Sequence, residues 1–443
     1  MPRFSPGEAM PPDTMPGVEI ITFGCRLNAF ESEIIGRAAA TAGLGDAIIV
    51  NTCAVTAEAE RQARQAIRRA RREHPRARII VTGCAATLAP ERYAALDEVD
   101  FVLDNEAKLR AESFEFGPTS PHPPTARAVG SPLARNAGEG AEARSAEAGE
   151  GVSTSPARVR AYLQVQQGCD HRCTFCIIPY ARGPSRSVAE DAITKEARRL
   201  VAGGVREIVL TGVDLTAYGA DLPGRPSLGV MVRHLLAAVP ELTRLRLSSL
   251  DPSEIDEPFW TLFGDEKRLM PHLHFSLQAG DDLILKRMKR RHTRAEAIAA
   301  ARRARDLRPE VALGADLIAG FPTETEEMFR RSLDLVEECA VAFLHVFPYS
   351  ARPGTPAARM PRLDPALVRE RAARLRAAGR AALDADLNTR VGSESAVLVE
   401  RPGVGRAEFY APVKLDTAHP VGSIERLRLV AARGGNLVGA PVP

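Results

Sequence analysis

The chain has 443 residues, more than one hydrophobic core usually supports, so the sequence predicts two or three domains. Hydrophobic residues make up 45% and charged residues 26%, as in ordinary globular proteins, and the net charge of +3 neither indicates nor excludes a polyanionic partner. No segment approaches the roughly 18 apolar residues of a membrane span, and no apolar leader segment follows Met1. We therefore expect a cytoplasmic protein with no membrane contact.

The N-terminal part of the chain has the pattern of a parallel α/β domain, which we place at residues 17–116. The preceding residues 1–16, rich in Pro and Met, are expected to form a disordered tail. Three apolar runs, VEIITFGC, AIIVNTC and ARIIVTGC, each end in a turn and a cysteine, at Cys25, Cys53 and Cys84. Helical patterns follow the first two runs. Because βα loops of a parallel sheet emerge at one edge, these three thiols are expected to converge.

The rest of the chain predicts a linker, a βα barrel and a small β domain. Residues 117–156 are rich in Pro, Gly, Ser, Ala and Glu and are expected to be a flexible linker. Within residues 157–385, a complete or partial six-stranded parallel barrel is predicted, with chemistry at the carboxyl ends of its strands. Its predicted strands are 161–166, 207–210, 244–248, 272–277, 311–319 and 342–347. Residues 390–443 are strand-like and turn-rich, which favours a small β-barrel, and we expect a monomer.

Cysteine usage points to metal chemistry. Seven cysteines, an odd number, in a chain without an export signal argue against a disulfide framework. Cys169, Cys173 and Cys176 follow the first predicted barrel strand with Cys-x3-Cys-x2-Cys spacing. Zinc is the alternative, but structural zinc sites are closed by four ligands and no second cysteine pair follows. His171 lies inside the loop and is expected to point away from the cysteines. A cubane iron-sulfur cluster held by three thiolates would keep one iron without a protein ligand.

This cysteine loop after a barrel strand resembles the radical S-adenosylmethionine (SAM) superfamily. The resemblance implies that the amino and carboxylate groups of SAM chelate the open iron. One-electron cleavage of SAM then releases a 5′-deoxyadenosyl radical inside the barrel. The barrel cysteines would thus hold a 4Fe-4S cluster and SAM together.

Further motifs resemble the radical SAM methylthiotransferase family over nearly the whole chain outside the tail and linker. They are FGCRLNAFESE, NTCAVT, QGCDHRCTFCIIPYARGPSRS, LTGVDLTAYG, LHFSLQAG, DLIAGFPTET and VFPYSARPGT. The resemblance implies that Cys25, Cys53 and Cys84 hold a second 4Fe-4S cluster and that the C-terminal segment is a TRAM-like RNA-binding barrel. Cys25-Arg26-Leu27-Asn28 is similar to the branch that acts on threonylcarbamoyladenosine in tRNA. The branches that act on isopentenyladenosine and on ribosomal protein S12 differ at these positions.

Other residues are candidates for binding SAM, although each also has a purely structural interpretation. Asp214 and Tyr218 follow the second barrel strand, and Ser276 and Gln278 end the fourth, two positions apart and so on one facing. Asp316 lies in an apolar strand, where a carboxylate needs a partner or a ligand. Arg182 and Arg186 follow the cluster loop, where an arginine can pair with a carboxylate or phosphate or can remain solvated. Cys339 is expected to be a packed core thiol.

Two regions are candidates for RNA contact. The segment 60–78 is densely basic and could neutralise phosphates, although most charge runs are only solvated faces. Its arginines include Arg61, Arg64, Arg68, Arg69, Arg71 and Arg72. In the C-terminal segment, Phe409, Tyr410 and Lys414 are candidates for base stacking and phosphate contact.

The resemblance therefore implies a methylthiotransferase that replaces the C2–H of threonylcarbamoyladenosine 37 in the tRNA anticodon loop with a methylthio group. One SAM would methylate sulfur at the N-terminal cluster and another would supply the radical. A one-electron reductant such as flavodoxin or ferredoxin is the implied partner. The alternatives are the same chemistry on isopentenyladenosine or ribosomal protein S12, and, in another class, a non-catalytic metal-binding RNA module.

Overall fold

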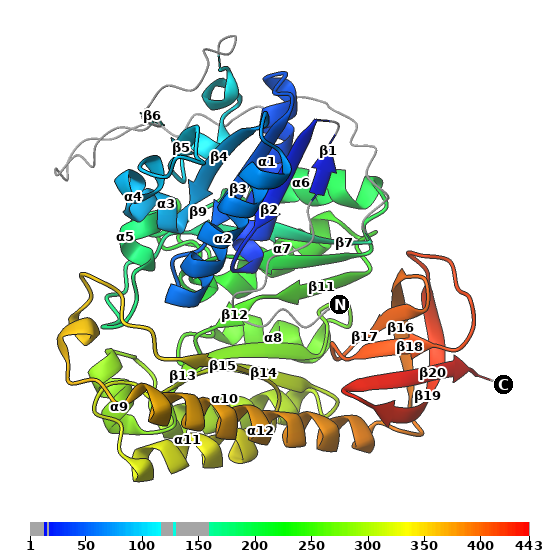
Figure 1. Cartoon of the computed structure of the whole chain (residues 1–443). Helices are drawn as coiled ribbons and strands as arrows, with labels where there is room; N and C mark the ends of the chain where they lie inside the picture. The colour runs from blue at the N-terminus through cyan, green and yellow to red at the C-terminus, as the bar shows by residue number, and fades with distance from the viewer. Residues whose placement is uncertain (1–12, 16, 117–126, 130–158, 443) are drawn as a thin grey trace. The chain divides into compact units, whose positions relative to one another are not determined.

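The computed structural model describes residues 13–15, 17–116, 127–129 and 159–442. The chain divides into two compact units, with the boundary between residues 156 and 157. Both units combine α-helices with β-sheets, as the sequence predicted (Figure 1). Each unit is described by itself below.

The first unit is built on a six-stranded sheet in the order β1-β2-β3-β4-β5-β6. Strands β2 to β6 are parallel to their neighbours, whereas β1 is antiparallel to β2. The strands are β1 (Asp13–Met15), β2 (Val18–Thr22), β3 (Ala47–Thr52), β4 (Arg78–Gly83), β5 (Phe101–Leu103) and β6 (Arg127–Val129). β1 falls within the predicted tail and β6 within the predicted linker. The remainder of both segments lies outside the described residues.

The helices of this unit follow the cysteine loops. They are α1 (Arg26–Thr41), α2 (Ala57–Glu73), α3 (Cys84–Leu88) and α4 (Pro90–Ala94), with 3-10 turns η1 (Ala107–Leu109) and η2 (Ala111–Phe114). Thr56 precedes α2, and its side chain accepts the amide N–H of Ala59 and so caps the helix. Every residue of β3 is buried, as expected for a central parallel strand covered on both faces.

The second unit begins with a partial parallel barrel. Its strands form two parallel sheets, in the orders β11-β10-β7 and β12-β13-β14-β15. They are β7 (Arg160–Gln164), β10 (Glu207–Thr211), β11 (Arg244–Leu247), β12 (Ser249–Leu250), β13 (His272–Gln278), β14 (Ala312–Ala319) and β15 (Val341–Pro348). The predicted strand 244–248 corresponds to β11, and β12 follows it after Ser248. A short antiparallel pair, β8 (Gln166–Gln167) with β9 (Arg186–Ser187), follows β7.

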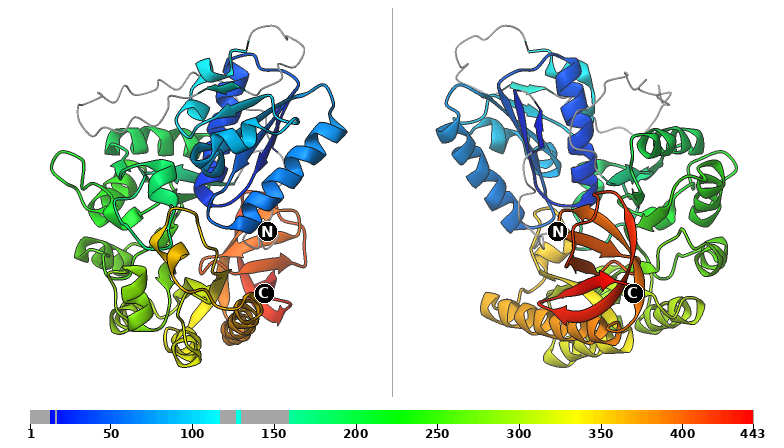
Figure 2. Two further views of the ribbon diagram at one scale, coloured as in Figure 1. Left: turned by 60° about the vertical axis from the view of Figure 1, so that its left-hand side comes forward. Right: turned by 90° about the vertical axis from the view of Figure 1, so that its right-hand side faces the viewer.

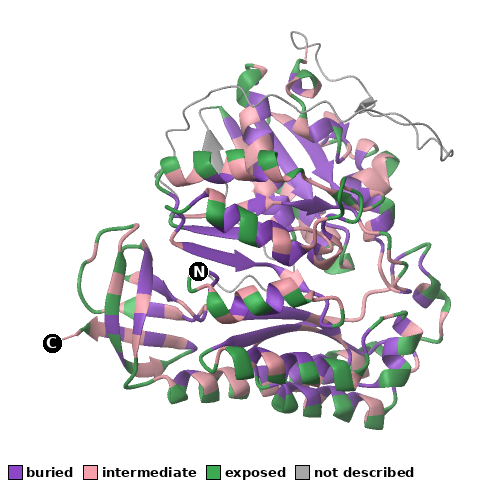
Figure 3. Ribbon diagram, turned by 180° about the vertical axis from the view of Figure 1, so that it is seen from behind, coloured by how far each residue is buried: buried purple, intermediate pink, exposed green. Residues whose placement is uncertain are grey.

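Helices surround these strands and bury their apolar faces. They are α5 (Ile178–Arg182), α6 (Glu190–Ala202), α7 (Leu228–Ala238), α8 (Glu257–Asp265), α9 (Asp282–Met288), α10 (Arg294–Leu307), α11 (Glu326–Glu338) and α12 (Pro365–Thr389), with η3 (Leu215–Ala217) and η4 (Pro356–Arg359). In β13, Leu273, Phe275 and Leu277 join the helix-side core. Figure 3 shows the strands largely buried and the helices exposed along one side. The alternate strand residues, many of them polar, therefore face the barrel interior.

A closed five-stranded β-barrel ends the chain, and it belongs to the same compact unit as the partial barrel. Its strands are β16 (Glu394–Arg401), β17 (Val404–Ala407), β18 (Pro412–Leu415), β19 (Ile424–Arg433) and β20 (Asn436–Pro441). Figure 2 shows it in red beside the long helix α12. Arg244 donates to the carbonyls of Ala396 and Arg406, so this small barrel covers the amino ends of the parallel strands. The carboxyl ends, where the cysteine loop lies, are at the opposite end of those strands.

Candidate metal centres

The loop that carries the three barrel cysteines leaves β7 and is held by backbone pairing. The amide N–H of Cys169 donates to the carbonyl of Gly183 at 3.1 Å. Gly168 adopts φ +71°, and a Cβ at this position would overlap the carbonyl of Pro184. Only glycine therefore permits the close approach of the two chain segments that starts the cysteine loop.

Gln166 is a positioning residue that sequence reasoning missed. Its amide group donates to the carbonyl of Gly168 at 2.8 Å and to Ser185 Oγ at 2.9 Å. Its Oε1 accepts the backbone N–H groups of Val213 and Asp214 at 2.9 and 2.8 Å. This fully buried side chain thus joins the cysteine loop to the loop after β10. A polar residue at the end of an apolar strand was the available signal.

Asp214, a predicted SAM contact, lies against the cysteine loop and pairs with His171. His171 Nε2 lies 2.7 Å from Asp214 Oδ2, and Cys169 Sγ lies 3.7 Å from the same oxygen. The prediction that His171 points away from the cysteines is therefore wrong, because the Asp214 carboxylate attracts it. Burial alone would raise the pKa of Asp214, but the hydrogen bonds from His171 and Thr216 and the charges of His171 and Arg291 together hold that pKa below its usual range.

The three thiols fit a shared cationic centre. Burial, together with the neighbouring Asp214, Cys176 and Cys173, raises the pKa of Cys169 to about 12. Thiolates gathered beside a carboxylate repel one another unless a metal cation replaces their protons. The donor set of three thiols without a fourth cysteine fits a cluster that keeps one iron open.

Arg290 is a second residue that the sequence did not single out. Its guanidinium donates to Asp251 Oδ2 and to the carbonyl of Ser276, both at 2.8 Å, and lies 3.9 Å from Cys173 Sγ. Burial alone would raise the pKa of Asp251, but His292 and Arg290 hold it well below its usual range. A permanent cation is thus fixed beside one of the cluster thiols.

The barrel interior contains a histidine pair around Asp316. Asp316 Oδ1 lies 2.9 Å from His274 Nε2 and 3.1 Å from His345 Nδ1. Gly314 makes this possible, because a Cβ there would overlap the His274 ring. Burial would raise the pKa of Asp316, but the two histidines hold it well below its usual range. The two histidines therefore supply the hydrogen-bond partners that the Asp316 carboxylate needs, and its contact with SAM remains a proposal.

The other predicted SAM-binding residues are placed differently from one another. Ser276 and Gln278 end β13, but the strand is irregular between Phe275 and Gln278, and Gln278 adopts φ +66°. The regular alternation that would put both side chains on one facing is interrupted there. Tyr218 is buried and donates its hydroxyl to the carbonyl of Val188 at 2.8 Å.

The two arginines after the cluster loop also differ. Arg182 is buried and donates to Gln167 Oε1 at 2.7 Å, so it is not a solvated loop residue. Arg186 is exposed, with a hydrogen bond of 3.4 Å to the carbonyl of Arg182. Of the two, only Arg186 is open to a ligand.

The N-terminal cysteines lie at one edge of the first sheet, at the carboxyl ends of three adjacent strands. In the register, Thr22, Asn51 and Thr82 are aligned, and Cys25, Cys53 and Cys84 follow these positions by two or three residues. Cys25 is exposed at the start of α1, whereas the other two are buried. Gly24 has φ +99°, and a Cβ there would lie 2.6 Å from Cys53 Sγ. The sulfur of Cys53 thus packs directly against the loop of Cys25.

Buried asparagines brace this edge of the sheet. Asn28 Nδ2 donates to the carbonyls of Phe23 and Thr52 at 2.7 and 3.1 Å, which joins the loops of Cys25 and Cys53. Asn51 Nδ2 donates to the carbonyl of Asn28 and to Ser32 Oγ, both at 3.0 Å. The donor set fits a second thiolate-held cluster at an edge that is partly open to solvent through Cys25.

Among the described residues, two groups of three ligand atoms lie within 4.8 Å of one another: Cys169 with His171 and Asp214, and His274 with Asp316 and His345. Neither cysteine trio is gathered that closely. A cubane cluster is larger than a single ion, so its thiolate ligands need more separation than the ligands of zinc.

The basic helix α2 is only partly free for RNA. Arg71 is a structural residue that donates to Asp100 Oδ2 at 2.6 Å and to backbone carbonyls, and Arg61 pairs with Glu58. Arg68 and Arg72 are exposed and Arg64 is half-buried. Arg69 is also exposed, but it pairs with Glu73 at 2.9 Å, and Arg68 lies 3.8 Å from Glu98.

Two candidate stacking residues of the C-terminal barrel are not available. Phe409 is buried beneath the guanidinium of Arg390, 3.8 Å from its ring centroid. Tyr410 stacks on His272 with ring centroids 4.3 Å apart. The prediction that these aromatic rings stack on RNA bases is therefore wrong, because they pack the protein interior. Lys414 is exposed.

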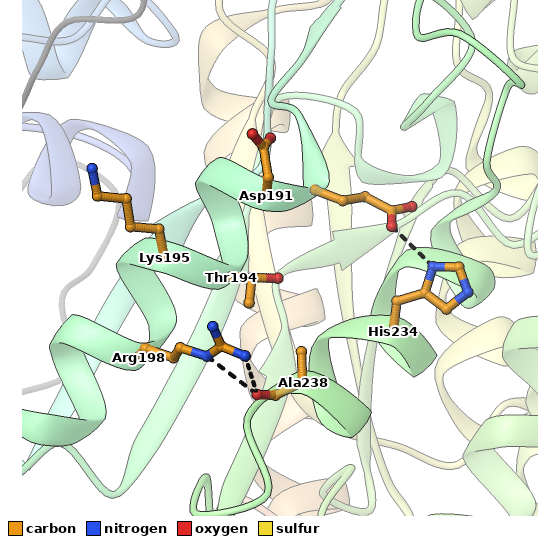
Figure 4. Close-up of a pocket in the computed structure, with 7 residues that line it drawn as sticks. Asp191, Thr194, Lys195, Arg198, His234 and Ala238 are labelled. Atoms are coloured by element: carbon orange, nitrogen blue, oxygen red, sulfur yellow. Dashed lines mark hydrogen bonds and ion pairs between the residues drawn. The ribbon is translucent and has the colours of Figure 1, made fainter.

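Cys339 and a surface hollow lie outside the predicted sites. Cys339 is fully buried in the helix-side core, as expected, and burial raises the pKa of its thiol to about 12. Figure 4 shows a surface hollow between α6 and α7, where His234 pairs with Glu190 at 2.9 Å. No described helix is long and apolar enough to cross a membrane.

Comparisons with known proteins agree with this geometry. Residues 163–336 match the radical SAM superfamily, and residues 17–104 match a family described as uncharacterized protein family UPF0004. A threonylcarbamoyladenosine tRNA methylthiotransferase MtaB from Rickettsia prowazekii is 46% identical over 94% of this chain and 96% of its own. The chain belongs to the radical SAM methylthiotransferase family.

Other members of this family are less similar. An MtaB protein from Aquifex aeolicus is 32% identical over 92% of this chain and 98% of its own. A tRNA-2-methylthio-N(6)-dimethylallyladenosine synthase from Ruegeria pomeroyi is 34% identical over 95% of this chain and 98% of its own. Among solved structures, the radical SAM methyltransferase TsrM from Kitasatospora setae superposes with a TM-score of 0.50 at 16% identity. It covers 75% of this chain and 67% of its own, which shows a shared fold.

Proposed function

We propose that this protein is a radical SAM methylthiotransferase that modifies C2 of threonylcarbamoyladenosine 37 in the tRNA anticodon loop. The observation that carries the proposal is the presence of two cysteine trios, each at the carboxyl ends of parallel strands. The 46% identity to a relative with this printed activity supports the choice of substrate. A cytoplasmic location and a monomer follow as part of the same proposal.

In this proposal Cys169, Cys173 and Cys176 hold one 4Fe-4S cluster with SAM, and Cys25, Cys53 and Cys84 hold another. Reductive cleavage of SAM supplies a radical able to remove hydrogen from a carbon without acidity or a leaving group. Gln166 and Arg290 fix the barrel cysteine loop, and Asn28 fixes the N-terminal one. Asp214, Tyr218, Ser276, Gln278, Asp316 and Arg186 are the proposed SAM-side residues.

The proposed RNA contacts lie on both units. Arg61, Arg64, Arg68 and Arg72 of α2 and Lys414 of the C-terminal barrel would contact phosphates. A low-potential one-electron carrier, a flavodoxin or ferredoxin, would supply the electrons.

The deciding experiment compares tRNA nucleosides by mass spectrometry from cells with and without this gene. Loss of the methylthio group from threonylcarbamoyladenosine is the expected result, restored by the wild-type gene but not by Cys169→Ala. Loss from the dimethylallyl nucleoside instead would favour the second candidate, which the 34% identity to the Ruegeria protein supports. No change in either nucleoside would contradict the proposal.

Metal content separates this proposal from a non-catalytic zinc module. The anaerobically reconstituted protein should bind about eight irons, and replacing either trio by alanine should remove about four. The reduced protein should also convert SAM to 5′-deoxyadenosine. Zinc binding without iron, or no cleavage of SAM, would support the module.

A further inference from the structure

Three segments that are distant in sequence meet at Thr174, between two of the barrel cysteines. The backbone N–H of Thr174 donates to the carbonyl of Met288 at 3.0 Å, and its hydroxyl donates to the carbonyl of Arg287 at 2.8 Å. Its own carbonyl accepts the N–H of Ala357 at 2.9 Å. The outer side of the cysteine turn is therefore covered by the end of α9 and by η4.

These same segments carry exposed cations without acidic partners. Each lies within two residues of Thr174 or of a residue bonded to it, and together we call them the basic rim: Arg172, Lys286, Lys289 and Arg359. None of the four forms an ion pair with another described residue. Lys286 and Lys289 also make no hydrogen bond there through their side chains. The nearby acids are engaged, Asp170 with the N–H of Ser185 and Glu254 with Arg291.

Exposed apolar side chains accompany this charge. Leu283 on α9 is 44% exposed and Tyr180 on α5 is 54% exposed. Beneath them, Phe175, Met288 and Ala357 belong to one apolar cluster, so the rim rests on a packed base. An exposed leucine on the helix that carries Lys286 suits a transient partner with an acidic surface.

We propose that the basic rim is the docking surface for an acidic one-electron carrier of the flavodoxin or ferredoxin class. This inference rests on the proposed function, which requires electrons at the barrel cysteines. In the step, the carrier is oxidised by one electron and the cluster is reduced by one, with no proton or bond transferred. Thr174 links the rim to both Cys173 and Cys176 through the backbone of one short turn.

RNA is the other polyanion that this surface could attract. The rim contrasts with α2, whose dense arginines suit the forked hydrogen bonding of phosphates. Two of the four rim cations are lysines, and the exposed Leu283 lies on the helix that carries one of them, Lys286. The observations therefore favour a protein carrier, and RNA binding is an outcome of the test.

The experiment uses the reconstituted full-length protein with the double variant Lys286→Glu/Lys289→Glu. The matched control, Lys195→Glu/Lys267→Glu, reverses two exposed lysines on other elements with the same change in net charge. Cluster reduction is followed by absorbance with reduced flavodoxin or ferredoxin and, separately, with dithionite. Binding of the oxidised carrier is measured by calorimetry at low and high salt.

The rim variant should bind the carrier about tenfold more weakly and accept its electrons about tenfold more slowly, with a weaker salt dependence. Reduction by dithionite should change less than twofold, and the control should match wild type in both. A neutral variant, Lys286→Gln/Lys289→Gln, should show an intermediate loss.

Three results would overturn the inference: unchanged carrier binding and reduction in the rim variant, wild type that accepts electrons from neither carrier, or a loss confined to tRNA affinity. If the carrier binds and reduces as expected but no methylthio nucleoside is formed, the docking surface stands and the proposed function fails. The two proposals are thus distinguishable.

Discussion

At the scale of single residues, glycine decides whether the N-terminal cysteines can approach one another. Gly24→Ala would place a Cβ 2.6 Å from Cys53 Sγ, whereas Gly43→Ala meets nothing within 4 Å. Both glycines have positive φ, so both variants should lose about 1 kcal/mol from backbone strain. Only Gly24→Ala should also lose about four irons, because it displaces a cluster ligand. An iron assay after reconstitution checks this, and equal iron in the two variants would contradict it.

The buried Asn28 side chain gives a second prediction at this scale. Asn28→Ala leaves the carbonyls of Phe23 and Thr52 without a donor that the structure supplies at 2.7 and 3.1 Å. Unsatisfied buried groups cost about 1–3 kcal/mol each, so the free energy of unfolding should fall by about 2–4 kcal/mol. Urea unfolding under anaerobic conditions measures it. Asn28→Asp keeps the shape but loses the amide donors, and should destabilise comparably. A wild-type midpoint in both variants would exclude this bracing role.

The six cysteines could be predicted because each follows a recognisable strand, and strand polarity places them without further information. The bridging contacts of Gln166 and Arg290 could not, because Val213 and Cys173 lie 47 and 117 positions away from them and only the folded barrel brings each pair together. His171 was misplaced for the same reason: the carboxylate that attracts it, Asp214, comes from the next strand. Local sequence thus places candidate ligands better than the residues that position them.

At the scale of elements, the apolar strands could be predicted from the sequence, but the points where they are interrupted could not. The interruption at Ser248 and the irregular end of β13 depend on sheet closure, which periodicity does not encode. The C-terminal aromatic residues suggested an RNA surface, since exposure cannot be read from a short strand. Their neighbours Arg160, Arg246 and Arg406, all near the Tyr410 ring, come from three different strands.

Strand β10 begins with a buried carboxylate that joins two of these strands. Glu207 lies 2.7 Å from Arg160 Nε and 3.0 Å from Arg246 Nε. Burial would raise the pKa of Glu207, but Arg246 and Arg160 hold it at about 2. Glu207→Gln should lower the free energy of unfolding at pH 7 by about 3 kcal/mol, because two buried cations lose their partner.

The pH dependence of this loss follows from the depressed pKa. Below the usual 4.5, the unfolded chain binds the proton and the folded chain does not, so the wild-type advantage disappears as pH falls toward 2. Urea unfolding at pH 7, 4 and 3 should show the variant and wild type converging. Glu257→Gln, which removes an exposed carboxylate paired with Arg303, should show no measurable difference. A constant gap for Glu207→Gln across these pH values would refute the argument.

At the scale of the second unit, the C-terminal barrel covers the amino ends of the parallel strands. Tyr410 of the small barrel stacks on His272, the first residue of β13, and Arg160 of β7 pairs with Glu400 at 3.0 Å. Truncating this domain would therefore expose charged strand ends. Loss of RNA binding in such a deletion could not be told apart from a folding defect. Point variants that separate the two roles are needed.

Tyr410→Ala and Lys414→Ala make this separation within one short segment. Tyr410→Ala removes the His272 stack and the three guanidinium contacts, and should destabilise the protein by about 2–3 kcal/mol. Lys414→Ala, exposed, should change stability by less than about 0.5 kcal/mol but weaken tRNA binding and flatten its salt dependence. Thermal unfolding and fluorescence titration with tRNA at two salt concentrations distinguish them. If Tyr410→Ala weakens tRNA binding without loss of stability, the ring contacts RNA. The contact between the two barrels would then depend on Arg160, Arg246 and Arg406 and not on the ring.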